Sequence, residues 1–278
     1  MHESRADRIR GKVYHPPDRF TEYDEVVYTR ADRLPPRPYA AFELPEGVAF
    51  RQEAAVQVAA MVRSLACRTA RADTHVFPGG AEVYVAGHAG DAERTPERFS
   101  YLPLPTIGDP HADGLIRRVL VAEPIGGDGA HARWAQGRLV STPLRSESGV
   151  EHGVLGTQWR RTSKAMIDRY VAEAREWASV TPVVVPGHDD GKRCKAEKLL
   201  GAALDHAGIP TSAVADIVLR RAPFWPGAQH PRSYFLPDYL RGNGTWHVYL
   251  AFREPVAGPI AIGAGRHSGL GLLAGLPC

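Results

Sequence analysis

Arg266 and His267, side by side near the end of the chain, are the residues best placed to do chemistry. Five glycines surround them: Gly263, Gly265, Gly269, Gly271 and Gly275. Glycine lets the backbone turn through positive φ and lets a second backbone come close. A phosphate group could therefore meet backbone N–H groups and the Arg266 guanidinium here. The alternative is a glycine-rich hairpin that is packed for shape alone.

This glycine loop does not follow the common nucleotide-binding fingerprints. A GxGxxG motif opens a helix, and a P-loop carries Gly-Lys followed by Ser or Thr. We expect no helix here, because only three residues follow Gly275. The loop therefore points to phosphate contact of another kind, or to none.

The elements that must position the loop follow a similar order twice. In the first half, hydrophobic periodicity predicts strands over 39–44, 99–107 and 115–123, and helices over 51–72 and about 128–139, leading to a further strand. The prolines in 99–107 are typical of an edge strand. In the second half we expect strands over 180–185, 216–220 and 246–252, a helix over 195–207, and a segment 257–262 that leads into the loop.

A β-α-β-β order with a final strand matches the ferredoxin-like split βαβ unit. The sequence thus predicts an α+β fold of two tandem ferredoxin-like domains with a C-terminal glycine-rich loop. The expected boundaries are a linker or arm over 1–38, a first domain over 39–150, a connecting helical segment over 151–175 and a second domain over 176–278.

Composition narrows the class of protein. The chain has 278 residues, 44% of them hydrophobic and 23% charged, with a net charge of +3, which is compatible with nucleic acid. It has neither an apolar run long enough for a membrane span nor a signal-peptide core. Its three cysteines share no metal-ligand spacing, which favours a reducing cytoplasm.

Four ordered motifs resemble one family. Residues 263–272 look like the C-terminal glycine-rich loop of the RAMP proteins of CRISPR systems. Residues 101–108 followed by 111–114, residues 177–184, and Trp246-His-Val with Gly258-Pro-Ile are similar to the fused Cascade subunit of type I-G (formerly I-U) systems. That subunit joins a capping RAMP domain to a repeat-cleaving RAMP endoribonuclease. The resemblance covers roughly residues 39–278 and falls on the cleaving half; the capping half is expected before it.

The resemblance implies metal-independent cleavage inside CRISPR repeat RNA, with no cofactor. The ribose 2′-OH attacks the adjacent phosphate and leaves a 2′,3′-cyclic phosphate and a 5′-hydroxyl. Histidine suits the two proton transfers because its pKa lies near working pH. Arginine or lysine suits stabilisation of the charged phosphorane. The implied partners are crRNA, a capping RAMP domain and a Cascade backbone subunit.

Three histidines are candidates for catalysis. His88 lies between glycines in Gly87-His-Ala-Gly90 and ranks first, because the resembling family often shows Gly-His here. His111 lies in a tight turn and would be the second proton carrier, although hydrogen bonding within the turn is the alternative. His267 would enter catalysis or only contact phosphate. We expect His247, in contrast, to be a packed sheet residue.

Candidate RNA contacts are basic groups together with the loop glycines. They are Arg117, Arg118, Lys192, Arg193, Lys195, Gly263, Gly265, Arg266, Gly269 and Gly271. Trp225 could stack on a base, but a buried anchor of its proline-rich loop is the favoured role, and Asp113 more plausibly caps its turn than acts as a base. Two further hypotheses remain open: an RNA-holding subunit that does not cut, and a ferredoxin-like small-molecule or regulatory domain.

Overall fold

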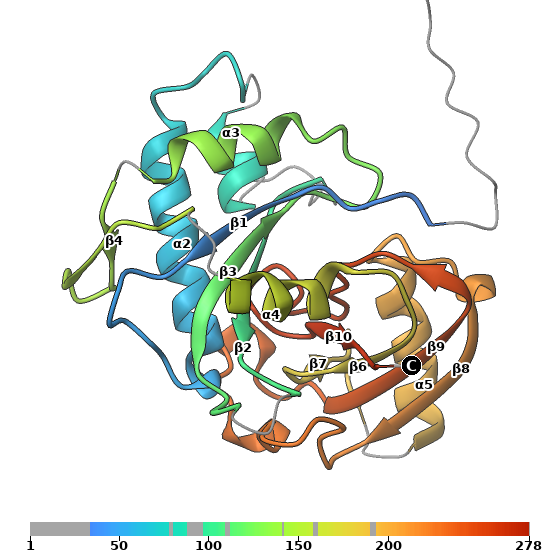
Figure 1. Ribbon diagram of the computed structural model, residues 1–278. Helices are drawn as coiled ribbons and strands as arrows, with labels where there is room; N and C mark the ends of the chain where they lie inside the picture. Colours follow the sequence, from blue (N-terminus) through green and yellow to red (C-terminus); the bar gives the residue numbers. More distant parts are fainter. Residues whose placement is uncertain are drawn as a thin grey trace, which may run out of the picture. The chain divides into compact units, whose positions relative to one another are not determined.

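The computed structural model describes residues 34–77, 80–87, 97–108, 112–140, 142–157, 161–189 and 193–277, and the side chains of all of these except 161–163 and 193. The described residues belong to one compact unit. Among them, no helix has both the length and the apolar character that a membrane crossing requires. Figure 1 shows one main sheet in each half of the sequence.

The first half is a three-stranded antiparallel sheet with a long helix. Its strands are β1 (Tyr39–Glu43), β2 (Ser100–Pro105) and β3 (Ile116–Ala122), in the order β1-β3-β2, and its helices are α2 (Ala55–Ala70) and α3 (Ala130–Arg138). Two short helical turns, η1 (Gln52–Ala54) and η2 (Glu82–Ala86), flank α2. Buried Val58, Val62 and Leu65 recur at helical spacing on α2, which is why this segment forms an amphipathic helix. The order is that of a ferredoxin-like sheet without its fourth strand.

Strand β2 lies at the edge of the first sheet, as its prolines predict, yet all six of its residues are buried. The glycine loop covers this edge: Tyr101 forms a parallel bridge with Ser268, and the Tyr101 N–H donates to the His267 carbonyl at 3.3 Å. The unpaired polar groups of an edge strand are thus partly satisfied by a segment from the other half. This contact sets the position of the candidate site.

The further strand expected at the end of the first half does not join its sheet. Instead β4 (Leu144–Arg145) and β5 (Glu151–Gly153) pair only with each other. Both strands are short, and Arg145 and Glu151 are exposed and paired. The hairpin therefore offers no continuous apolar face that would insert it into the core sheet.

The second half has the four-strand order of a ferredoxin-like sheet, with the glycine loop in place of the helix between its last two strands. Helix α4 (Arg161–Val171) precedes β6 (Ala174–Ser179), β7 (Val183–Val184), α5 (Arg193–Asp205), β8 (Val214–Arg220), β9 (Thr245–Val256) and β10 (Leu273–Gly275). The antiparallel sheet runs β10-β6-β9-β8, with β7 also paired to β9. Three short 3-10 turns lie between these elements: η3 (Thr211–Ala213), η4 (Pro231–Ser233) and η5 (Asp238–Leu240).

One expectation for this half needs correction. Of the strand expected over 180–185, only Val183 and Val184 form a strand, β7, since Pro182 has no N–H to donate; the longer strand, β6, lies before it and ends at Ser179. The last strand, β10, follows the glycine loop, whereas segment 257–262 contributes only the Ala261–Leu272 bridge. A cis Gly258–Pro259 peptide lies within that segment.

The two halves share a buried cluster. Leu102 and Leu104 of β2, Tyr170 of α4, Ala178 of β6 and Leu272 before β10 pack together in it. Figure 1 shows α4 lying over this junction. Since strands from both sheets contribute to one core, the junction holds the glycine loop against the edge of the first sheet.

Candidate nucleic-acid interface

The glycines of the loop are required by its backbone conformation and close packing. Gly263, Gly269 and Gly271 have φ of +91°, +83° and +68°, a region that disfavours other residues. A Cβ on Gly269 would lie 2.8 Å from the Ala55 carbonyl oxygen, and one on Gly265 would lie 2.8 Å from the Leu270 Cβ. The loop is therefore pressed between α2 and its own second limb, and all four of these glycines are buried.

Many backbone N–H groups of the loop are already used. Ala264 donates to Val184, Ser268 to Gly265 and Gly271 to Pro182. Those amides do not point to an open anion site. At the tip of the loop, the side chains of Arg266, His267 and Ser268 remain partly exposed.

The His267 imidazole is held in one tautomer. Its Nδ1 lies 3.2 Å from the Phe99 carbonyl oxygen and 2.9 Å from the Ser100 Oγ. A carbonyl oxygen only accepts hydrogen bonds, and so Nδ1 carries the proton and donates it. Nε2 is then the unprotonated acceptor, and it is buried without a hydrogen-bond partner among the described residues.

A buried arginine from outside the loop, Arg37, holds the residues around His267 in place. Arg37 donates to the Ser100 Oγ at 2.6 Å, to the Glu123 carbonyl at 2.7 Å and to the Pro259 carbonyl at 3.4 Å. It thereby ties the start of β2 to the end of β3 and to the segment before the glycine loop. Of the segment expected as a linker or arm, residues 1–33 lie outside the described residues, and Arg37 is 93% buried, since its exposed fraction is 7%.

Positive charge gathers around His267. Burial, followed by repulsion from Arg266, Arg98 and Arg37, lowers the pKa of His267 well below its usual value. Burial lowers the pKa of Arg37 to about 10, with repulsion from Arg266 adding to it, and burial together with Arg98 lowers that of Arg266 to about 10. In the described part of the chain, no carboxylate pairs with Arg37 or Arg266. We call Arg37, Arg98, Arg266 and His267 the Arg–His cluster; it is a place where an anion would relieve repulsion.

His247 provides an internal comparison. Its Nδ1 also lies beside a serine, Ser179, with 3.0 Å to the Oγ, but its Nε2 lies 3.0 Å from the Gln229 carbonyl oxygen. Nε2 is therefore the protonated donor, the opposite tautomer to His267. Both nitrogens are engaged and the side chain is buried, which confirms that His247 is a packed sheet residue.

Acid should destabilise the fold through these two histidines. The pKa values of His267 and His247 are both lowered in the folded state, chiefly by burial. The unfolded chain then binds more protons below its histidine pKa of about 6.5, and so the free energy of unfolding falls as pH falls from there. Each histidine adds a slope of up to about 1.4 kcal/mol per pH unit. Urea unfolding between pH 7.5 and pH 5 measures the slope, which should flatten in His267→Gln; an unchanged slope in that variant contradicts the lowered pKa.

Among the three candidate catalytic histidines, the structure describes one. His88 and His111 lie outside the described residues, and their roles stay predictions. His267 is in the Arg–His cluster. The Tyr84 ring stacks on the His131 ring, with 4.1 Å between the ring centroids.

The other basic candidates do not gather at the cluster. Arg117 pairs with both carboxylate oxygens of Asp113, at 2.9 and 2.7 Å, and Arg118 lies 3.9 Å from Glu43. In the β2–β3 ladder Arg118 faces Leu104, four residues from Ser100 and thus roughly 13 Å along the sheet. Lys195 is on α5, which packs on β8; Lys192 and the Arg193 side chain lie outside the described part.

Two minor expectations hold. The Asp113 carboxylate accepts the Leu115 N–H at 3.0 Å, which confirms a turn-capping role. Trp225 is buried and donates from Nε1 to the Ala178 carbonyl at 3.0 Å, which confirms that it anchors its loop.

Sequence reasoning missed Arg37, Arg98 and Ser100. Arg37 lies in a proline-rich stretch that has no hydrophobic periodicity, and its local sequence does not predict that it is buried. The Arg98-Phe-Ser100 triplet at the start of the edge strand was a usable signal, because a cation and a hydroxyl there end up facing whatever covers that edge. Across the described residues, no group of three or more His, Cys, Asp or Glu side chains is placed to hold a metal ion.

The fold and the loop place the chain among α+β proteins with ferredoxin-like topology and a C-terminal glycine-rich loop. The chain belongs to the CRISPR-associated protein GSU0054 family, whose model matches residues 1–275. This confirms the CRISPR part of the resemblance, whereas the type I-G assignment stays a prediction.

Two solved structures are similar in outline. A Cas6 product complex is 13% identical, with a TM-score of 0.39 over 85% of this chain and 98% of that one. A second structure, described as CRISPR-associated protein Cas6, is 8% identical, with a TM-score of 0.38 over 87% and 99%. No curated protein matches the chain.

Proposed function

We propose that this protein is an endoribonuclease that cleaves within CRISPR repeat RNA without a metal ion and leaves a 2′,3′-cyclic phosphate and a 5′-hydroxyl. The Arg–His cluster carries the proposal. It offers a neutral imidazole with an unpaired acceptor nitrogen, surrounded by arginine side chains, at a loop that also reaches the edge of the first sheet. Membership of a CRISPR-associated family supports CRISPR repeat RNA as the substrate.

In this mechanism His267 is the general base. Its Nε2 takes the proton of the ribose 2′-OH while the 2′-oxygen forms a bond to phosphorus and the bond to the 5′-oxygen breaks. The phosphate also offsets the repulsion from Arg266, Arg98 and Arg37, so that binding raises the pKa of His267 and makes it a stronger base. Arg266 stabilises the charge on the phosphorane. The leaving 5′-oxygen takes its proton from a general acid, for which His88 and His111 stay our candidates.

One observation favours a second function, that of a crRNA-holding subunit that does not cut. His267 Nε2 is buried, and so a ribose hydroxyl reaches it only after the surrounding groups move. In that case the cluster binds a phosphate, and His267 only holds Ser100 in place through their hydrogen bond. On either reading we propose that the protein works beside other Cascade subunits, including a capping RAMP domain and a backbone subunit.

Chelation separates the proposed chemistry from that of a metal-dependent nuclease. We expect cleavage of repeat RNA to proceed at the same rate in excess EDTA as in magnesium, because the 2′-OH, a base and fixed cations suffice for the reaction. The measurement is a single-turnover time course with end-labelled RNA, after the protein has been dialysed against chelator. Loss of cleavage in EDTA, with recovery when magnesium is added, would contradict the metal-free mechanism.

A further inference from the structure

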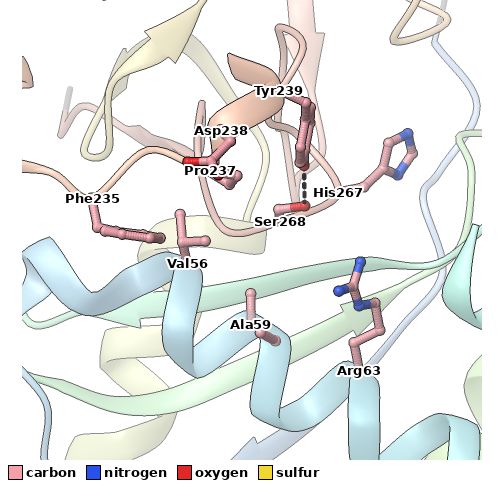
Figure 2. Close-up of a pocket in the computed structure, with 10 residues that line it drawn as sticks. Val56, Ala59, Arg63, Phe235, Pro237, Asp238, Tyr239, His267 and Ser268 are labelled. Atoms are coloured by element: carbon pink, nitrogen blue, oxygen red, sulfur yellow. Dashed lines mark hydrogen bonds between the residues drawn. The ribbon is translucent and has the colours of Figure 1, made fainter. Parts of the chain in front are cut away.

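A cavity lies beside the tip of the glycine loop, and His267 of the Arg–His cluster is among its lining residues. Its volume is about 290 Å³, close to the lower end of about 300–1,000 Å³ that is usual for small-ligand pockets. In Figure 2, α2 forms one wall with Val56, Ala59 and Arg63, while segment 235–239 and Ser268 form the other. The imidazole of His267 is at the edge and is directed away from Tyr239.

Two aromatic side chains stand exposed on this cavity. Tyr239 is 64% exposed and Phe235 is 46% exposed, and they are two of the five large hydrophobic side chains that the described part of the chain leaves exposed. The Tyr239 hydroxyl is 3.4 Å from the Ser268 Oγ, which ties this ring to the glycine loop. Exposing large aromatic surface to water is unfavourable, whereas an unpaired nucleobase would cover it by stacking.

The charges around the cavity fit a nucleotide. Arg63 reaches from α2 toward the loop and has no hydrogen-bond or ion-pair partner within the described ranges. The one acidic group on the wall, Asp238, is paired with Arg241 at 2.9 Å, which reduces its repulsion of a phosphate. His267 also lines the cavity, and the arginines of the Arg–His cluster that act on it add further positive charge nearby.

We propose that this cavity binds one unpaired nucleotide of the RNA, with its base stacked on Tyr239 and its phosphate facing Arg63, next to the nucleotide whose phosphate lies at the Arg–His cluster. The proposal rests on the proposed function, since it places the same RNA on both sides of residues 267 and 268. It adds a base-stacking subsite beyond the cluster. A stacked base would fix the register of the strand, and thereby which phosphate meets His267.

The test uses the full chain and repeat RNAs that carry 2-aminopurine at each unpaired position in turn. Stacking on an aromatic ring quenches 2-aminopurine fluorescence, and this readout needs no cleavage. We expect one position to be quenched by the wild-type protein and by Tyr239→Phe, and the quenching to be lost in Tyr239→Ala. Affinity should fall roughly 5- to 150-fold in Tyr239→Ala, the effect of losing one stacked base. Tyr39→Ala removes an exposed tyrosine outside the cavity and is the matched control.

The outcomes separate the two proposals. Quenching and affinity that are unchanged in Tyr239→Ala, with wild-type cleavage intact, would overturn the stacking subsite and leave the nuclease standing; a protein segment would then be the better occupant. Tyr239-dependent quenching without any cleavage would support the subsite and overturn catalysis. Equal losses in Tyr239→Phe and Tyr239→Ala would also overturn stacking, because Phe keeps the ring and loses only the hydrogen bond to Ser268.

Discussion

Replacing His267 by alanine should lower the single-turnover cleavage rate by about 10²- to 10⁴-fold, the usual contribution of a general acid or base. RNA affinity should change little, because the neutral imidazole carries no charge to the phosphate and the arginines of the cluster remain. The rate is measured with RNA-saturated enzyme and the affinity by filter binding. His267→Gln is the second variant, because an amide donor can still reach the Phe99 carbonyl but cannot act as a base.

His247→Gln is the matched control for this experiment. It removes a histidine with the same type of serine contact but with both nitrogens engaged. We expect it to lower the melting temperature while the cleavage rate per folded molecule stays near that of the wild type. Full activity in folded His267→Gln would contradict the general-base assignment and move it to His88 or His111.

Arg266→Ala should weaken RNA binding by about 1–3 kcal/mol, the range for hydrogen bonds to charged groups. The plot of log affinity against log salt should also lose about 0.7 of its slope, the value of one phosphate contact to a single strand. In the free protein the same change removes a cation beside His267, and so the pKa of His267 should rise. Salt-titrated binding and NMR titration of the imidazole measure the two effects.

Arg117→Ala is the control for charge alone. Asp113 already pairs with this guanidinium through two hydrogen bonds, and so its loss should cost much less affinity than the loss of Arg266. Equal effects of the two substitutions would mean that the protein attracts RNA through its net charge and that the cluster is no specific site. Unchanged RNA binding in Arg266→Ala would mean that the glycine loop has only a structural role.

Much of the fold could be predicted because its helices and strands bury periodic apolar faces. The segment of α2 shows helical spacing, and Gly208 and Pro210 end the segment of α5 within a few residues of its observed end. The errors fall where the chain lacks such a pattern. Strand β10 has only three residues, the last of them a glycine, and its pairing with β6 is a contact of high sequence separation that no local pattern reveals.

The candidate site was predictable only in part, for a similar reason. Arg266 and His267 stand out because a basic pair among glycines is unusual in a purely structural turn. Arg37 does not stand out, since its position depends on acceptors at Ser100, Glu123 and Pro259, which are far apart in sequence. The tautomer of His267 could not be predicted from the sequence either, because the Phe99 carbonyl sets it.

The central claim is that this chain cuts RNA through the ribose 2′-OH, and the end groups of the product test it most directly. Purified protein is incubated with a labelled CRISPR repeat RNA, and with the same RNA carrying a 2′-deoxy nucleotide at the cut, and the products are identified by mass spectrometry. The account predicts one cut that leaves a 2′,3′-cyclic phosphate and a 5′-hydroxyl, and no cut in the deoxy RNA. Tight binding without cleavage, or a product with a 3′-hydroxyl, would contradict it.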